Sequence, residues 1–467
     1  MSTERFDVLV LGAGSAGFAA ARTAGATGAT VGLIDKGPLG GLCILKGCMP
    51  SKALLRTSEV IHLIRHAGEL GLDVAEPTID WERIMARRAR LVREFADYRI
   101  EQIDRCPNTT LIMGEPRFLD PHTVQVGERT LYGGQIIIAT GSRTFIPPVP
   151  GLADVGYITS DEALELPALP ASLLVVGAGA VGLELGQFYQ RMGAAVTVVQ
   201  RGAHILSGED ADVAEALTNV LKGDGMTVLS GARCLSARRH DGQIELTVSV
   251  GGADKTLRAE QLMIAAGRIG NLEFLDLAQA GLQAVNGFLP VDGELRTAVP
   301  HIFAAGDVTG KRLLVHLAIQ QAEWAAHNAC HPGQPKRADY RLIPSAVFTD
   351  PGVADVGLKE HEARSQGLDV LVGKYEFAEH GKAMCMGTPA MHGFVKLIGD
   401  ARTGEILGAA IVGPEAADLI HELVVAMHYR ATAGDLAMIP HVHPTLAEIV
   451  TYPAEEIEEQ RQARLNG

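Results

Sequence analysis

Several features are scarce or missing in this 467-residue sequence, and each absence narrows what the protein can be. No apolar run approaches the ~20 residues that a membrane-spanning helix needs, so we expect no membrane association. The formal net charge of −14 lacks the basic excess typical of a nucleic-acid binder, so we expect no nucleic-acid partner. The first residues lack a basic start followed by an apolar stretch and a cleavage site. This predicts a cytoplasmic location, or an organelle interior after removal of a transit peptide.

Cysteine is also scarce, with six residues in the whole chain, and only Cys43 and Cys48 lie close together in the sequence. A long chain without a secretion signal does not indicate a disulfide framework. Two cysteines cannot fill a four-ligand zinc site, and no nearby histidine completes one. Pro50 indicates the start of a helix, which places Cys48 near a helix N-terminus, where the thiolate is favoured. We therefore favour a transient disulfide over a metal site and predict no bound metal.

Glycine, in contrast, is abundant, with 53 residues, and it forms two loops of the same pattern. The first loop follows a strand-like run at 6–11 and precedes an alanine-rich helix, and a second run at 30–34 ends in Asp35. Its three glycines are predicted to make the tight turn, to let a phosphate approach the helix N-terminus and to let the helix pack on the strand; they are Gly12, Gly14 and Gly17. Asp35 is placed to accept hydrogen bonds from ribose hydroxyls. The segment therefore predicts a dinucleotide site.

The second loop repeats this arrangement between a strand at 172–176, a helix at 183–192 and a strand at 195–199, with Gly177, Gly179 and Gly182 in the same positions. The residue after its second strand is Gln200 instead of an acid, and Arg201 follows. An acid there would favour NAD and repel a 2′-phosphate, whereas an arginine can pair with that phosphate. The pattern leans towards NADPH or use of both nucleotides, and an exposed loop charge is the alternative interpretation of Arg201.

The remaining pattern indicates an α/β fold in which two Rossmann-like dinucleotide-binding domains precede a separate C-terminal α+β domain. Helical spacing dominates residues 51–105, and we expect the arginines at 87–93 to face solvent. A proline-rich stretch at 147–150 marks the first boundary. The predicted domains are a first dinucleotide-binding domain in two parts, 1–148 and 269–342, a second dinucleotide-binding domain at 149–268 and the C-terminal domain at 343–467.

A second candidate for chemistry lies near the C-terminus, where Glu448 follows His443 by five residues. A carboxylate can orient a histidine and keep it basic, as in catalytic dyads. Taken alone, this pattern leaves a structural histidine as the more common interpretation. His441 is expected to be structural.

Together these segments resemble the flavin-dependent pyridine nucleotide–disulfide oxidoreductases, a group that contains dihydrolipoyl dehydrogenase and glutathione reductase. The resemblance covers essentially the whole chain, and the C-terminal His-Pro-Thr run is most similar to dihydrolipoyl dehydrogenases. It implies FAD on the first glycine loop, NAD or NADP on the second, and a redox-active Cys43–Cys48 disulfide. Further cofactor-binding residues that it implies are Asp35, Lys36, Thr140, Gly141, Gly267 and Asp307.

The resemblance also implies catalytic roles. Lys52 is expected beside the flavin and paired with Glu184, and His443, supported by Glu448, is expected to face the cysteine pair of a second chain. The protein would then be a homodimer with shared active sites that oxidises a dithiol, with a lipoyl-bearing protein as a possible substrate. Two alternatives stay open, an NADPH-dependent reductase of the glutathione-reductase type and a non-catalytic flavoprotein subunit.

Overall fold

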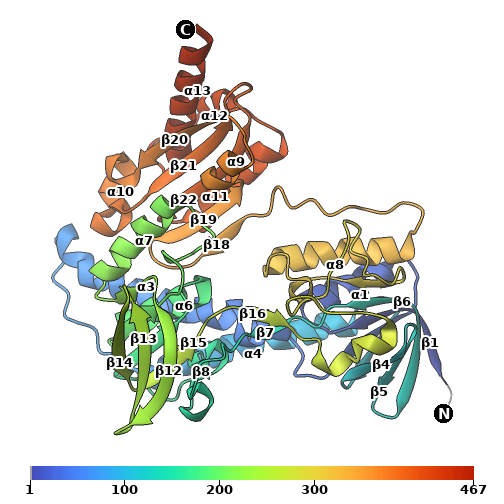
Figure 1. Cartoon of the computed structure of the whole chain (residues 1–467). Coiled ribbons are helices and arrows are strands. Elements are labelled where there is room, and N and C mark those ends of the chain that lie inside the picture. The colour runs from blue at the N-terminus through green and yellow to red at the C-terminus, as the bar shows by residue number, and fades with distance from the viewer. Residues whose placement is uncertain (1–2, 467) are drawn as a thin grey trace. The chain divides into compact units, whose positions relative to one another are not determined.

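The computed structural model describes residues 3–466, which form two compact units (Figure 1). Unit 1 is made of Met1–Ala53, Met85–Phe145 and Gly267–Asp339, and unit 2 of Leu54–Ile84, Ile146–Ala266 and Tyr340–Gly467. Helices α3 (Cys48–His66) and α4 (Trp81–Asp104) each contribute residues to both units.

Unit 1 is built on a sheet with the strand order β3-β2-β1-β6-β5-β4, in which β17 also pairs with β6. Strands β1, β2, β3, β6 and β17 run parallel, and β4 and β5 are antiparallel additions. The bounds are β1 (Glu4–Leu11), β2 (Val31–Asp35), β3 (Thr109–Met113), β4 (Pro116–Asp120), β5 (Thr123–Val126), β6 (Arg129–Ile138) and β17 (Ile302–Ala304). Two short strands, β7 (Ser142–Thr144) and β16 (Arg268–Gly270), form a separate antiparallel pair.

Two alanine-rich helices, α1 (Ser15–Ala26) and α8 (Val315–Cys330), share one buried core with the parallel strands of unit 1. Their small side chains allow a close approach of helix to helix and of helix to sheet. The fully buried alanines include Ala20, Ala24, Ala322 and Ala325. This packing fixes the N-terminus of α1 against the carboxyl edge of the sheet, which is where α/β folds bind nucleotides.

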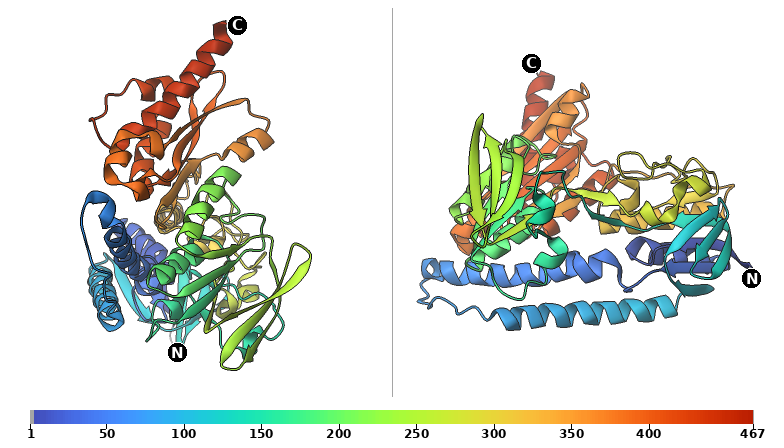
Figure 2. Two further views of the ribbon diagram at one scale, coloured as in Figure 1. Left: turned by 90° about the vertical axis from the view of Figure 1, so that its left-hand side faces the viewer. Right: turned by 60° about the horizontal axis from the view of Figure 1, so that its bottom comes forward.

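Unit 2 contains a second parallel sheet with the order β11-β10-β9-β15-β8. Three antiparallel strands form another layer, seen in light green in Figure 2, and share a core with the parallel sheet through Leu174, Leu246 and Leu262. The bounds are β8 (Ile158–Thr159), α5 (Ser160–Ala163), β9 (Ser172–Val176), α6 (Ala180–Arg191), β10 (Ala195–Val199), α7 (Ala211–Gly223), β11 (Thr227–Leu229), β12 (Arg233–His240), β13 (Gln243–Val250), β14 (Ala253–Ala259) and β15 (Gln261–Ile264).

The C-terminal part of unit 2 is an antiparallel sheet, β18-β19-β22-β21-β20, on which helices α11 and α13 pack. The bounds are β18 (Ser345–Val347), β19 (Gly352–Gly357), α9 (Glu360–Ser365), β20 (Val370–Glu376), α10 (Gly381–Met386), β21 (Phe394–Asp400), β22 (Ile406–Gly413), α11 (Ala416–His428), α12 (Ala433–Ala437), η8 (Ala447–Val450) and α13 (Thr451–Asn466).

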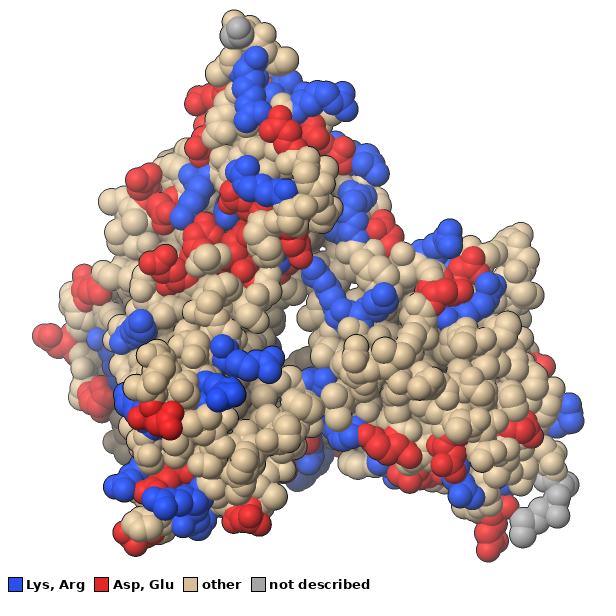
Figure 3. All heavy atoms as spheres, viewed as in Figure 1, with Lys and Arg blue, Asp and Glu red and all other residues tan. Residues whose placement is uncertain are grey.

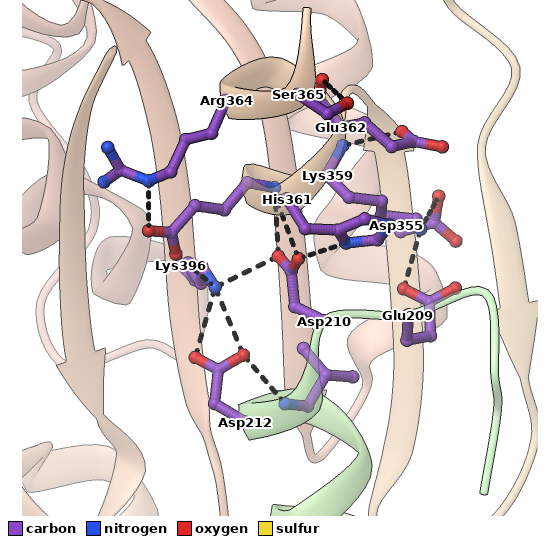
Figure 4. Close-up of polar contacts among 12 residues, drawn as sticks. Glu209, Asp210, Asp212, Asp355, Lys359, His361, Glu362, Arg364, Ser365 and Lys396 are labelled. Carbon is purple, nitrogen blue, oxygen red and sulfur yellow. Dashed lines mark hydrogen bonds and ion pairs between the residues drawn. The ribbon is translucent and has the colours of Figure 1, made fainter. Parts of the chain in front are cut away.

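Buried ion pairs connect the C-terminal sheet to the start of α7 (Figure 4). The ammonium group of Lys396, on β21, lies 3.0 Å from Asp210, 3.1 Å from Asp212 and 2.8 Å from Glu360, and its side chain is 3% exposed. A buried charge is costly unless opposite charges and hydrogen bonds surround it. This cluster therefore ties the C-terminal sheet to the start of α7 within unit 2.

The structure confirms the predicted α/β class with two Rossmann-like sheets and a C-terminal α+β part. The helical prediction for 51–105 is wrong in one stretch, because residues 71–80 contain neither helix nor strand. The expected solvent-facing arginines are also not all exposed. Arg88 is only 7% exposed, and the neighbouring Arg87 donates to the carbonyl of Ala53, in α3, at 2.8 Å.

Candidate functional site

The first glycine loop joins β1 to α1 in the geometry that the sequence predicts. Gly12 has a φ of +109°, which non-glycine residues rarely adopt, and its amide donates to the carbonyl of Ile34. A Cβ atom at Gly17 would overlap the carbonyl oxygen of Gly12. At Gly14 a Cβ would meet only Gly41, at 3.7 Å, so the helix N-terminus stays open to a ligand. The loop thus has the tight turn, the close packing and the open approach that a pyrophosphate needs.

Asp35 closes this loop from the end of β2. Its carboxylate accepts hydrogen bonds from the amides of Ala13 (2.6 Å) and Gly37 (2.7 Å), which fixes its position beside α1. Lys36 points elsewhere, with its ammonium 3.3 Å from Glu115 and 4.9 Å from the ring of Phe274. Asp35 is therefore held where a ribose would bind, and the contacts of Lys36 are with protein groups at the surface.

A second group of polar residues gathers where β6 and β17 end side by side. The hydroxyl of Ser142 donates to Asp307 at 2.6 Å and accepts from Arg268 at 2.7 Å. Thr140 precedes them, and its hydroxyl is buried without a hydrogen-bond partner among residues 3–466. Gly141 and Gly267, with φ of +72° and +117°, make the turns between these segments. A buried hydroxyl without a partner, two positions before the Ser142 cluster, suits a polar ligand such as a nucleotide.

The sequence alone does not indicate roles for Ser142 and Arg268, although each follows a glycine with a predicted role. Their grouping depends on the pairing of β7 with β16, which brings together segments 126 positions apart. No local pattern in the sequence reports such a pairing.

The predicted redox pair lies at a junction of two helices. Cys43 is within α2 (Gly41–Lys46), Cys48 is the first residue of α3, and both are reduced. A hydrogen bond to Cys48 and burial raise the pKa of the Cys43 thiol, and the charge of Arg99 opposes this. Cys48 lies at the N-terminus of α3, where the positive end of the helix dipole favours a negative charge. Arg99 is a further neighbour that the sequence did not reveal.

The second glycine loop repeats the first in unit 2. Gly177 has a φ of +111°, and a Cβ atom at Gly182 would overlap the carbonyl oxygen of Gly177. Apart from its own chain neighbours, no atom of the described residues lies within 4 Å of the place that a Cβ of Gly179 would take. Gln200 is the equivalent in this loop of Asp35 in the first loop. Its side-chain oxygen accepts a hydrogen bond from the amide of Ala178 at 3.3 Å, as Asp35 does from Ala13. Arg201 is exposed.

Glu184 lies two residues after Gly182 on α6 and is buried, with 5% exposure. Its carboxylate accepts a hydrogen bond from the amide of Phe348 at 2.9 Å. Lys52, its expected partner, follows Cys48 by one helical turn and belongs to unit 1. The pairing of Lys52 with Glu184 stays a prediction.

The C-terminal histidines behave differently from each other. Nδ1 of His443 lies 3.0 Å from Glu448, and the His443 side chain is 79% exposed, so the opposite nitrogen, Nε2, points away from the carboxylate. His441 is 9% exposed and bonded through both nitrogens, to the carbonyl of Ile439 (2.9 Å) and to Glu422 (2.7 Å). His443 has the geometry of a base, and His441 that of a structural residue.

Three further features of the described residues are the distribution of charge, the absence of a metal-ligand cluster and the absence of a membrane-spanning helix. Basic and acidic side chains are interspersed over the face shown in Figure 3. Among residues 3–466, no group of three or more histidines, cysteines and acids is placed to hold a metal ion. None of the helices in this range has the length and apolar composition that crossing a lipid bilayer requires.

Comparisons with known proteins agree with this geometry. Residues 6–322 match the family described as pyridine nucleotide-disulphide oxidoreductase, and residues 343–454 match its dimerisation domain. The dihydrolipoyl dehydrogenase of Geobacillus stearothermophilus is 36% identical over 454 residues, covering 96% of this chain and 95% of that protein. The dihydrolipoyl dehydrogenase of Chlorobaculum tepidum is 37% identical, covering 96% of each. A solved Cu(II) complex of the HOCl-induced flavoprotein disulfide reductase RclA from Escherichia coli has a TM-score of 0.86 and 25% identity, covering 98% of this chain and 100% of that one.

Proposed function

We propose that this chain, which belongs to the pyridine nucleotide–disulphide oxidoreductase family, oxidises a dihydrolipoyl-type dithiol through its Cys43–Cys48 pair. The chain is a flavin-dependent enzyme that uses FAD and a nicotinamide nucleotide. The observation that carries the choice of substrate is the occurrence, in one chain, of a cysteine pair at a helix N-terminus and an exposed histidine oriented by a carboxylate.

The residues present fit FAD in unit 1. The Gly12–Gly17 loop offers a helix N-terminus with room for a pyrophosphate, and Asp35 is fixed at its side for the ribose. The unpartnered hydroxyl of Thr140 and the carboxylate of Asp307 offer further polar contacts. When bound, FAD supplies the transfer of an electron pair between the reduced cysteine pair and the nicotinamide.

The chain's own residues carry out thiol–disulfide exchange. Nε2 of His443 takes the proton of a substrate thiol, while Glu448 holds Nδ1–H and stabilises the imidazolium. The substrate thiolate attacks the sulfur of Cys43, and the Cys43–Cys48 bond breaks with Cys48 leaving as thiolate. The second substrate thiol then attacks the mixed disulfide, which releases the substrate as a disulfide and leaves Cys43 and Cys48 reduced. The substrate loses two electrons, and the cysteine pair gains them.

We further propose a homodimer in which His443 of one chain serves the cysteine pair of the other. The dimerisation-domain match over 343–454 supports a dimer, and the exposure of His443 leaves it accessible to a second chain. A lipoyl-bearing protein remains a possible substrate and the cytoplasm a predicted location. We also propose domain boundaries after residues 148, 268 and 342. The start of the dimerisation-domain match at residue 343 supports the last of these.

The nicotinamide preference is a separate proposal. Gln200 is neutral and Arg201 is exposed, so neither repels a 2′-phosphate. We therefore propose that the enzyme accepts NADP(H) as well as NAD(H), which also leaves room for a disulfide reductase of the glutathione-reductase type.

The test is a side-by-side assay of the purified holoenzyme with dihydrolipoamide and with glutathione disulfide, each with both nicotinamides. We expect turnover of dihydrolipoamide that exceeds turnover of glutathione disulfide. Cys48→Ser should abolish this turnover and retain FAD, because the second sulfur is needed to form the disulfide. Unaltered dithiol turnover in Cys48→Ser, or turnover of glutathione disulfide alone, would contradict the proposal.

A further inference from the structure

His380 lies behind the His443–Glu448 pair and was not singled out from the sequence. His380 directly precedes α10 and is 1% exposed. Neither of its ring nitrogens has a hydrogen-bond partner among the described residues. Its Nε2 lies 3.5 Å from Oε1 of Glu448, while the other oxygen of that carboxylate, Oε2, lies 3.0 Å from His443. One carboxylate thus lies between two imidazoles, one exposed and one buried.

The unpartnered nitrogens make His380 unusual. Buried polar groups are nearly always hydrogen-bonded, because an unpaired one loses its interactions with water. The carboxylate of Glu448 lies 3.5 Å from Nε2, and a small turn of either side chain brings the two within hydrogen-bond distance. The structure therefore offers one specific contact that satisfies His380.

The protonation state of His380 decides what such a contact can do. Burial lowers the pKa of His380, the Glu448 carboxylate opposes this, and His443 reinforces the lowering. The imidazole is consequently neutral at neutral pH and donates a hydrogen bond without adding a positive charge. A cation at this place would compete with the imidazolium of His443 for the carboxylate, whereas a neutral donor orients the carboxylate and leaves its charge intact.

An aromatic ring also packs against His380 and makes no hydrogen bond to its ring nitrogens. Tyr452, on α13, presents its ring edge-on, with centroids 6.1 Å apart, and stacks on Tyr375 of β20 at 4.2 Å. The hydroxyl of Tyr375 donates to the carbonyl of Glu379 at 3.2 Å. The aromatic pair therefore packs against His380, and Glu448 and His443 are the ionisable groups that share its charge environment.

We propose that His380 is a positioning residue that holds Oε1 of Glu448, so that Oε2 keeps the proton of His443 on Nδ1 and leaves Nε2 as the base. The role of His443 in it rests on the function proposed above. The contacts of Glu448 with the two histidines lie within one chain, so they can be tested with and without a substrate.

The main experiment compares His380→Phe, which keeps a ring of similar size without a donor, with His380→Gln, whose amide can donate to Glu448. In rapid-mixing measurements on the holoenzyme, His380→Phe should slow flavin reduction by dihydrolipoamide by about tenfold or more, because that reaction needs the base. Flavin reduction by NADH, which does not use the dyad, should be unchanged. His380→Gln should recover most of the lost rate.

A second readout needs no turnover. Diethyl pyrocarbonate modifies the neutral form of His443, and mass spectrometry of the peptide that contains it gives the pH at which modification is half-maximal. We expect this pH to fall by about 0.5–1 units in His380→Phe, because a poorly held carboxylate favours the imidazolium less. Tyr452→Phe, which keeps the ring against His380, is the matched control and should leave the half-maximal pH unchanged.

The outcomes separate the two proposals. Failure of the wild-type enzyme to oxidise dihydrolipoamide would contradict the proposed function, and the modification of His443 would still test the contact. An unchanged half-maximal pH in His380→Phe, or an equal loss in both flavin-reduction reactions, would overturn the role of His380. Failure of His380→Gln to restore either property would overturn it as well.

Discussion

The two glycine loops share one backbone design but are closed by different side chains. In both, the first glycine has a φ near +110°, and the third packs directly on the carbonyl of the first. Asp35 closes the first loop with a charged acceptor at 2.6 Å from Ala13, whereas Gln200 closes the second with a neutral one at 3.3 Å from Ala178. The backbone thus fits the part that dinucleotides have in common, a pyrophosphate, and the closing residue fits the part in which they differ.

The difference also suggests how firmly each nucleotide is held. A charged acceptor makes a stronger hydrogen bond than a neutral one, and Asp35 accepts two of them within its loop. We expect the first site to hold FAD as a resident cofactor and the second to exchange its nicotinamide in each turnover.

The largest effect is expected from an added methyl group at the third glycine. In Gly17→Ala the Cβ overlaps the Gly12 carbonyl, which should destabilise the loop by about 1–3 kcal/mol or more and yield protein without FAD. The equivalent Gly182→Ala should retain FAD and lose most of its flavin reduction by NADH. Flavin absorbance per chain and the rate of that reduction check both, and complete FAD loss in Gly182→Ala would break the comparison.

A smaller effect is expected at the closing residues. Asp35→Ala removes two charge-assisted hydrogen bonds and should weaken FAD binding by about 2 kcal/mol, roughly 30-fold in Kd. Gln200→Ala removes a longer, neutral bond and should raise the KM for the nicotinamide by less than about fivefold. The measurements are FAD titration of the apoprotein and steady-state kinetics. Equal effects at both positions would mean that charge does not distinguish the loops.

The effect on the choice of nicotinamide is expected to be smaller than the loss of FAD affinity in Asp35→Ala. Gln200→Glu introduces the acid that the first loop has, and it should shift the ratio of kcat/KM for NADH over NADPH upwards by about tenfold. Arg201→Ala should shift the ratio in the same direction, since it removes the cation available to a 2′-phosphate. A ratio unchanged in both variants would show that neither side chain reaches the ribose.

The sequence predicted the parts of the molecule that depend on local patterns. Each glycine loop, the cysteine pair at the start of α3 and the five-residue spacing of His443 and Glu448 lie within short segments, so spacing alone determines their geometry. The contact of Ser142 with Asp307 joins residues 165 positions apart and arises from the parallel pairing of β6 with β17.

The residues around His443 could not be predicted from local patterns either. His380 reaches Glu448 because a short helix and the C-terminal helices pack on one sheet, and a lone histidine in the sequence gives no sign of this. The prediction that Arg88 faces solvent was wrong for a similar reason, since helical periodicity in an arginine-rich segment does not show which positions other parts of the chain cover.

The most direct test of the central claim, that the cysteine pair stores electrons alongside the flavin, is an anaerobic titration of the holoenzyme with NADH. Disulfide and FAD each take two electrons, so full reduction should require about two equivalents per chain. Cys48→Ser, which cannot form the disulfide, should require about one. A wild-type endpoint at one equivalent, equal to that of Cys48→Ser, would contradict the account.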